Sequence, residues 1–357
     1  MMNKENSTSP DDTVMTVTGP IPVDQLGITL VHEHIMVDGP VWFSEPDESA
    51  RHLRDVPVDK SLYQELRVNP YASKDNVFML DVGIAIEELA IFKGLGGGTV
   101  VDVSCRGIGP FPEKLKKVSE GSGVNLIMGT GYYYETAHPP EVKNMSIPQL
   151  VDQMVEDITI GVNGTGIRAG IIGEVGVSWD FTAEEIKCLR AGVQASNQTK
   201  VPLTIHQPSF YRMANQVVDI ILEEGGDLRH TIIDHMCASG KDLDYQLGVL
   251  ERGVFIEYDL IGSDLYYPSI GTGQPEDEEN AFHIKRLIDA GYVGQLMLSH
   301  DIFIKICLKH YGGRGYGHIL KKFVPMLKNA GVTDEQIRTM LVDNPKRLFT
   351  YTDPPIS

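Results

Sequence analysis

Eight short runs of apolar residues recur along the chain, and most of them are followed by an amphipathic stretch. Nearly continuous apolar runs of this length are typical of strands that are buried on both faces of a parallel sheet. We predict strands over residues 29–34, 99–103, 125–129, 170–174, 202–206, 231–235, 254–258 and 296–300. Eight parallel strands separated by helices predict a (β/α)8 TIM barrel. A doubly wound open sheet is the alternative, but no Gly-x-Gly-x-x-Gly motif follows an early strand.

Helix signals between these runs support the alternation. Asp81 can cap a helix over residues 82–95, which ends in consecutive glycines. Thr182 opens a capping-box pattern at the start of another helix. A further helix begins near Thr333, and Asn344-Pro345 is expected to break the chain after it.

The connections between elements predict three more features. Residues 14–17 and 21–26 flank Gly19-Pro20 and are expected to form a short N-terminal β-hairpin. Two connections are unusually long, residues 35–80 after the first strand and 259–280 after the seventh, and such loops usually carry function. We expect residues 1–12 to be a disordered polar leader and residues 13–357 to form a single domain.

Composition restricts the partners and the location of the protein. The formal net charge of −18 argues against nucleic acid or an anionic membrane as the main partner, and leaves a small-molecule substrate. The four cysteines lie far apart and are expected to be free thiols of a reducing compartment. The first residues lack the apolar core of a signal peptide, and no apolar run could span a bilayer, so a cytoplasmic location is expected.

Two histidines at the end of the first predicted strand suggest a metal site. Side chains alternate along a strand, so His32 and His34 share one face while Glu33 points to the other. Two neighbouring imidazoles make half of a site for a divalent metal, although His-x-His alone is weak support.

Further metal-type residues fall at the carboxyl ends of later strands. Glu174, His206, His235 and Asp301 are separated by 32, 29 and 66 residues, which are one, one and two β/α units. The carboxyl ends of barrel strands meet at one face, so all six side chains are expected to converge there. Any one histidine at a strand end is more often a satisfied polar group, but six compatible residues in this register favour a shared metal site.

Four imidazoles and two carboxylates are too many ligands for one tetrahedral zinc ion. They suit two divalent ions that share a bridging carboxylate and a bridging hydroxide, because paired metals lower the pKa of bound water. Asp301 could hold a metal with one oxygen and accept a proton with the other. His300 and Glu33 have the opposite strand parity to the ligands beside them and are expected to pack outside the barrel interior.

The sequence resembles the phosphotriesterase family of the amidohydrolase superfamily, and within it the phosphotriesterase-related branch. The resemblance runs from about Val14 to Phe349. It is carried by the segments GITLVHEHI, GGGTVVDVS, IMGTGYYYE, RAGIIGEVG, LTIHQP, IIDHM, LSHD, YGGRGYGHIL and DNPKRLF.

The resemblance implies a β/α barrel with a binuclear centre, usually of Zn²⁺ and sometimes of Mn²⁺, Co²⁺ or iron. It implies that His32, His34 and Asp301 hold a buried ion and that His206 and His235 hold a more exposed one. Glu174 would bridge them where phosphotriesterases proper use a carboxylated lysine. The loop after His235 also departs from the family, because many relatives carry an Asp-Arg pair there. A homodimer is a further possibility that the family suggests.

Several residues near the predicted mouth are candidates for substrate contacts. Tyr133, Tyr134, Trp179 and Tyr267 could form an apolar wall with hydroxyl donors, or could simply pack around their loops. Arg212, Lys241 and Arg314 could pair with an anionic group of the substrate, or could be solvated surface charges.

These observations predict a metal-dependent hydrolase in which a bridging hydroxide opens a small lactone, carboxylic ester or N-acyl amide. Hydrolysis of phosphotriesters is an alternative, as a promiscuous activity, because the same metals would polarise a P=O group. A barrel that binds metal without catalysis is the remaining alternative. A closed, fully coordinated site would favour it, whereas an open position favours the enzyme.

Overall fold

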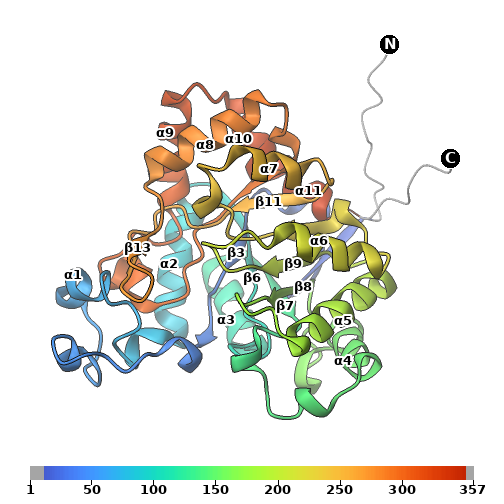
Figure 1. Cartoon of the computed structure of the whole chain (residues 1–357), viewed down its shortest axis with the longest axis horizontal. Helices are drawn as coiled ribbons and strands as arrows, with labels where there is room; N and C mark the ends of the chain where they lie inside the picture. Colours follow the sequence, from blue (N-terminus) through green and yellow to red (C-terminus); the bar gives the residue numbers. More distant parts are fainter. Residues whose placement is uncertain (1–11, 351–357) are drawn as a thin grey trace.

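The computed structural model describes residues 12–350 and contains an eight-stranded parallel sheet curled into a barrel (Figure 1). The strand order is β14-β11-β10-β9-β8-β7-β6-β3. Their bounds are β3 Ile28–Glu33, β6 Gly97–Asp102, β7 Asn125–Thr130, β8 Ile171–Gly176, β9 Leu203–His206, β10 Thr231–Ile233, β11 Phe255–Tyr258 and β14 Leu296–Leu298. All eight predicted strands are present, and the prediction of a TIM barrel is confirmed.

The first and last barrel strands, β3 and β14, meet at the seam where the sheet closes. The backbone N–H of His32 donates to Ser299 Oγ at 2.9 Å. The backbone N–H of Asp301 donates to the carbonyl of His32 at 3.4 Å. Because no regular ladder joins these two strands, individual hydrogen bonds next to the predicted metal ligands close the barrel.

Helices follow most barrel strands and surround the sheet (Figure 1). Asp81 Oδ1 accepts from the N–H of Ile84 and caps α2 (Val82–Gly94), and Thr182 forms a capping box at the start of α5 (Ala183–Thr199), as predicted. The helices are α1 Tyr63–Leu66, α2 Val82–Gly94, α3 Pro112–Ser122, α4 Ile147–Thr159, α5 Ala183–Thr199, α6 Ala214–Glu223, α7 Leu243–Leu250, α8 Asp277–Asp289, α9 Val324–Asn329, α10 Asp334–Arg338 and α11 Asn344–Phe349.

The prediction that Asn344-Pro345 breaks the last helix is wrong. Asn344 has helical dihedral angles, φ −68° and ψ −49°, and a π-helical turn over Thr339–Asp343 joins α10 to α11. The altered hydrogen-bond pattern of this turn lies just ahead of Pro345, which has no N–H to donate. The buried amide of Asn344 donates to the carbonyls of Val293 and Leu296, which ties the helical segment to β14.

The predicted N-terminal hairpin is present, but its turn lies two residues earlier than expected. Strands β1 (Thr13–Thr16) and β2 (Gly19–Pro22) pair in antiparallel fashion with Thr16 opposite Gly19, so the turn is Val17-Thr18. Thr16 Oγ1 donates to the carbonyl of Gly19 at 2.6 Å and accepts from the N–H of Thr18 at 3.3 Å. The Thr16 hydroxyl therefore stabilises a turn at Val17-Thr18, whereas the Gly19-Pro20 dipeptide had predicted the turn at its own position.

The barrel interior is apolar at the end that the hairpin covers. Buried side chains from seven barrel strands form one cluster with hairpin and connecting residues. Two of these strands show the same parity for the apolar residue and the polar residue above it: Ile232 precedes Asp234 by two, and Phe255 precedes Glu257 by two. An apolar layer therefore supports the polar layer that lies toward the carboxyl ends of the strands.

The two long loops lie side by side at the carboxyl end of the barrel (Figure 1). The loop after β3 contains α1 and the short strands β4 (Val37–Asp38) and β5 (Phe78–Met79), and the loop after β11 contains β12 (Tyr266–Tyr267) and β13 (Thr272–Gly273). Tyr63 Oη donates to Asp264 at 2.7 Å, and the N–H of Tyr266 donates to the carbonyl of Arg67 at 2.8 Å. Within residues 12–350, no helix has the length and apolar character needed to cross a membrane.

Candidate metal centre

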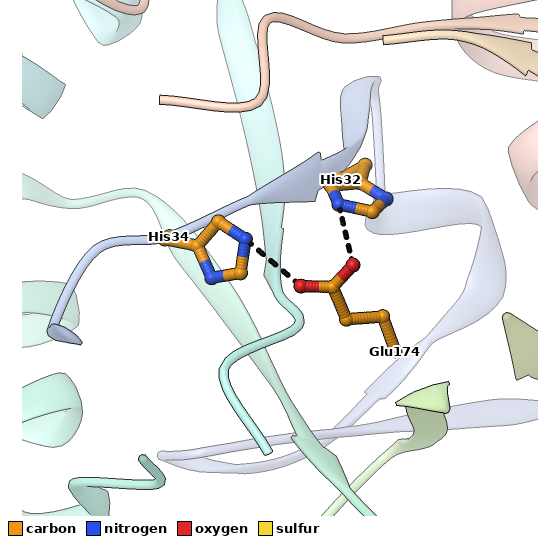
Figure 2. Close-up of side chains that lie close together, drawn as sticks. All are labelled: His32, His34 and Glu174. Carbon is orange, nitrogen blue, oxygen red and sulfur yellow. Dashed lines mark ion pairs between the residues drawn. The ribbon is translucent and has the colours of Figure 1, made fainter. Parts of the chain in front are cut away.

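His32 and His34 lie on either side of the Glu174 carboxylate (Figure 2). His32 Nε2 is 3.4 Å from Glu174 Oε2, and His34 Nε2 is 3.2 Å from Glu174 Oε1. The two histidines come from the end of β3, and Glu174 comes from β8, across the barrel mouth. All three side chains are buried. Each oxygen of the Glu174 carboxylate thus faces a different imidazole.

His206 and His235 lie against the same carboxylate. His206 Nδ1 is 2.9 Å from Glu174 Oε2, and His235 Nε2 is 3.7 Å from it. The two ring nitrogens are 2.8 Å apart. His206 is the last residue of β9, and His235 follows the end of β10. These two histidines and Glu174 form a second group of potential ligands.

Asp301 follows β14 and completes the cluster. Its Oδ1 lies 3.3 Å from His34 Nε2 and 3.7 Å from His32 Nε2, and its Oδ2 lies 3.9 Å from His235 Nδ1. The structure therefore brings all six predicted ligands together.

Two of these residues hold backbone conformations that side chains with a Cβ rarely adopt. His235 has φ 59° and Asp301 has φ 51°. Such conformations cost about 1–3 kcal/mol each and persist only where the surroundings enforce them. The N–H of His235 donates to Asp259 Oδ2 at 2.7 Å, which enforces one of them. Backbone strain at these two ligand positions, which are neighbours in space, indicates that the two side chains are oriented for function and not only for packing.

The donor set fits a pair of divalent metal ions. His32 is completely buried, yet neither of its ring nitrogens has a hydrogen-bond partner. A buried nitrogen without a partner is costly unless an ion or a proton satisfies it. Imidazoles with carboxylates are the ligands that zinc and similar ions prefer.

The charged neighbours control protonation in the absence of metal. Burial opposes protonation of His34, but Asp301 and Glu174 outweigh it and raise the pKa of His34 to about 9. Burial likewise opposes ionisation of Glu174, but His206 and His32 hold its pKa well below the usual value. The cluster therefore attracts positive charge, whether as protons or as metal ions.

A second layer of polar groups orients the histidines. His34 Nδ1 is 2.9 Å from Ser104 Oγ, and His235 Nδ1 is 3.1 Å from Asp259 Oδ2. His32 Nδ1 is 3.3 Å from Asp234 Oδ2. The Ser104 hydroxyl by a hydrogen bond, and the two carboxylates by their closeness, can fix the ring orientation of these histidines.

Three buried acids in this layer were missed by the sequence interpretation: Asp234, Glu257 and Asp259. They surround His32 Nδ1, and neither oxygen of Glu257 has a hydrogen-bond partner. Burial raises the pKa of Glu257 well above its usual value, and Asp259 adds to the effect. The signal for two of them in the sequence is that Glu257 and Asp259 alternate along the seventh strand as interior residues do.

A cavity of about 450 Å³ opens above the centre. Its lining includes five of the six predicted ligands, all except His32. It also includes Tyr133, Trp179 and Tyr267 from the predicted substrate contacts. Tyr134 lies beside it, with its ring 4.1 Å from that of Tyr133.

The three predicted cationic contacts are placed elsewhere. None of Arg212, Lys241 and Arg314 belongs to the cavity lining. Each is paired with an acid instead, at 3.2 Å to Asp242, 3.1 Å to Glu279 and 3.1 Å to Asp277 respectively. Chain position alone could not distinguish a loop side chain that points into the mouth from one that points away.

Comparison with known proteins agrees with this geometry. The model of the phosphotriesterase family matches residues 12–349. A phosphotriesterase-related protein of Nematostella vectensis is 37% identical over 344 residues, covering 94% of this chain and 98% of the relative. An N-acetyltaurine hydrolase of Danio rerio is 35% identical over 341 residues, covering 95% and 98%. The crystal structure of a resiniferatoxin-binding protein from Rhodobacter sphaeroides superposes with a TM-score of 0.93 at 42% identity, covering 96% of each chain.

Proposed function

The chain belongs to the phosphotriesterase family of hydrolytic enzymes, and on that premise we propose that it is a binuclear metal hydrolase acting on a lactone, a carboxylic ester or an N-acyl amide. One observation carries the proposal. Five of six metal-type side chains form part of the wall of a cavity large enough for a small molecule. A purely structural site would be closed on all sides.

We propose that His32, His34 and Asp301 hold one ion, that His206 and His235 hold the other, and that Glu174 bridges them. Zn²⁺ suits this mixture of imidazoles and carboxylates best, with Mn²⁺, Co²⁺ and Fe²⁺ as alternatives. When bound, two such ions supply a nucleophile derived from water at neutral pH and polarise the substrate carbonyl.

Asp301 is the proposed proton acceptor. Burial opposes its ionisation, but His34, His235 and His32 lower its pKa, so the carboxylate is charged and able to accept a proton at neutral pH. It lines the cavity, whereas the acids beneath His32 do not. Asp301 can therefore reach the substrate and pass the proton to the leaving alcohol or amine.

Tyrosine hydroxyls are the proposed donors to the substrate. Burial raises the pKa of Tyr133 well above its usual value, with Glu174 adding to the effect, so the hydroxyl stays protonated. Tyr133 lies with its ring 4.9 Å from that of His206, beside the more exposed ion position. The hydroxyl is suited to orient a carbonyl compound without adding charge.

The name of one relative supports an amide over the alternatives. The Danio rerio relative is named for hydrolysis of an N-acyl amide. A phosphotriester remains the second candidate reaction, because the family name refers to it. The free state of all four cysteines is consistent with the cytoplasmic location that we propose, and a homodimer remains a prediction.

The experiment is a hydrolysis screen of metal-loaded protein with matched lactones, esters, N-acyl amides and phosphotriesters. We expect turnover of a carbonyl substrate that disappears after chelation and returns with added Zn²⁺. Glu174→Gln should lose both bound metal and turnover, whereas Glu120→Gln, an exposed residue of α3, should keep both. Folded, metal-loaded protein without turnover on any class would refute the proposed function.

A further inference from the structure

We propose that the cavity selects uncharged carbonyl substrates carrying an aromatic ring or a similarly flat apolar group, and discriminates against substrates with a sulfonate or carboxylate in that place. This inference rests on the proposed hydrolase function and specifies the chemical class of the substituent that the substrate carries near its reacting carbonyl.

A continuous wall of aromatic rings leads away from the metal centre. It begins at Tyr133, which packs against His206. Neighbouring ring centroids along the wall are 4.9–6.4 Å apart, in the order Tyr133, Trp42, Phe303, Tyr71, Tyr267 and Phe210. All six rings line the cavity. An aromatic group of the substrate could extend this series by edge-to-face or offset stacking.

The wall is assembled from loops that follow five different strands. The loop after β3 supplies Trp42 and Tyr71, and the loops after β7, β9, β11 and β14 supply one ring each. Contacts between rings join these loops, in addition to the hydrogen bonds between the two long loops. The surface is therefore formed before substrate binds, which reduces the entropy lost on binding.

Away from the metal centre and its histidines, no positive side chain lines this cavity to balance an anion. Among the described residues 12–350, the lining contains neither lysine nor arginine. It does contain Glu174 and Asp301. A sulfonate held against the rings would lose its hydration without gaining a counter-ion, and such desolvation is costly.

The polar groups of the wall are neutral donors. Burial raises the pKa values of Tyr71 and Tyr267 above their usual range, so both hydroxyls stay protonated. Such groups can hydrogen-bond to an ether, hydroxyl or carbonyl oxygen of a neutral substrate. The cavity volume of about 450 Å³ also exceeds what a two-carbon sulfonate chain would fill.

The two tryptophans provide a binding assay that does not depend on turnover. The chain contains only Trp42 and Trp179, and both line the cavity. Their fluorescence should therefore report occupancy. Suitable probes are benzylacetone, a ketone that cannot be hydrolysed, and the otherwise identical ketone in which a sulfonate replaces the phenyl ring.

We expect benzylacetone to give a saturable change in emission with a Kd at least about tenfold lower than that of the sulfonate ketone, a difference of about 1.4 kcal/mol. Equal or tighter binding of the sulfonate ketone would overturn the inference. The measurement is made with metal-loaded protein, so that both ketones meet the same centre.

A substitution that adds a cation to the cavity lining tests whether the lack of lysine and arginine there disfavours the sulfonate. Ile270 lines the cavity from the loop between β12 and β13 and is 48% exposed. Ile270→Arg should tighten binding of the sulfonate ketone and weaken binding of benzylacetone. Ile160→Arg, at a 65% exposed position after α4 and outside the cavity, is the matched control and should change neither. An unchanged preference in Ile270→Arg would contradict the electrostatic argument.

Turnover separates this inference from the proposed function. The matched substrates are N-acetyl-phenethylamine with N-acetyltaurine, and the corresponding pair of acetate esters. Faster hydrolysis of the sulfonates would refute the inference while supporting the hydrolase. Preferential binding of benzylacetone with no hydrolysis of any substrate would refute the hydrolase while supporting the inference.

Discussion

Glu33 Oε1 accepts two hydrogen bonds from His300, one from its backbone N–H at 2.8 Å and one from its ring Nδ1 at 2.7 Å. The other ring nitrogen, Nε2, accepts from the N–H of Ile319 at 3.0 Å. Both residues are thus engaged at the barrel seam, outside the cavity lining, although each adjoins a proposed metal ligand. This placement agrees with the prediction from strand parity that Glu33 and His300 pack outside the barrel interior.

Removal of the Glu33 carboxylate should weaken the seam. Glu33 also accepts from the N–H of Ile302 at 3.1 Å, so Glu33→Ala leaves three buried donors without an acceptor. We expect a loss of about 3–5 kcal/mol in unfolding free energy, measured by denaturant titration, together with weaker metal retention. Glu48→Ala, at an exposed position, serves as the control. A stability of Glu33→Ala equal to that of the control would contradict this role.

Metal affinity should increase with pH up to about 9. The pKa of His34 is raised to about 9 in the metal-free cluster, where Asp301 and Glu174 outweigh the opposing effect of burial. A raised histidine pKa stabilises the metal-free fold below the unfolded value near 6.5, and that contribution is lost as the pH rises through the folded value. Metal must displace this proton, so binding should release protons at neutral pH.

Calorimetry in buffers of different ionisation enthalpy measures that release. The exposed His52 lies outside the cluster, so His52→Asn should retain the wild-type proton release. Metal affinity that stays constant between neutral pH and about pH 9 would contradict competition with the His34 proton.

Asp301→Asn should separate proton transfer from metal binding. The amide keeps one oxygen ligand but cannot accept a proton, so kcat should fall by about 10²–10⁴-fold. Glu174 and the four histidines remain, so much of the metal should stay bound, as measured by elemental analysis. Asp289→Asn on the exposed end of α8 should behave as wild type. Unchanged turnover would rule out the proton acceptor role of Asp301.

Glu257→Gln should stabilise the metal-free protein at alkaline pH. Burial raises the pKa of Glu257, so the folded state retains a proton that the unfolded chain has already lost above its ordinary pKa. That difference disfavours folding increasingly as the pH rises, until Glu257 ionises in the folded state. The amide of Gln does not titrate, so this pH-dependent loss of stability disappears in the variant. We expect the unfolding free energy to rise by about 1–3 kcal/mol at about pH 8 and to change little at about pH 5.

Thermal unfolding at the two pH values measures this effect. Glu251→Gln, an exposed residue that follows α7, is the matched control. A lower Tm for Glu257→Gln than for the wild type at alkaline pH would show that the Glu257 charge has a favourable partner.

Some elements could be predicted because their physical causes are local. Apolar runs define the strands, and Asp81 and Thr182 cap helices through hydrogen bonds to residues within one turn. The six ligands could be found because each stands at or near a strand end, and β/α units repeat at nearly constant length. The errors were equally local, since Thr16 moved the hairpin turn and a π-helical turn carried the chain past Pro345.

The sequence by itself determined the barrel, its eight strands and the identity of the side chains that meet at its mouth, because period and spacing encode which face a residue takes. Only the tertiary structure decided what surrounds that centre. The acids beneath His32, the aromatic wall and a cavity lining without lysine or arginine among residues 12–350 depend on segments after different strands that pack against one another. The direction of a side chain in a long loop follows from these contacts and not from a repeating pattern, so the specificity of the site could not be read along the chain.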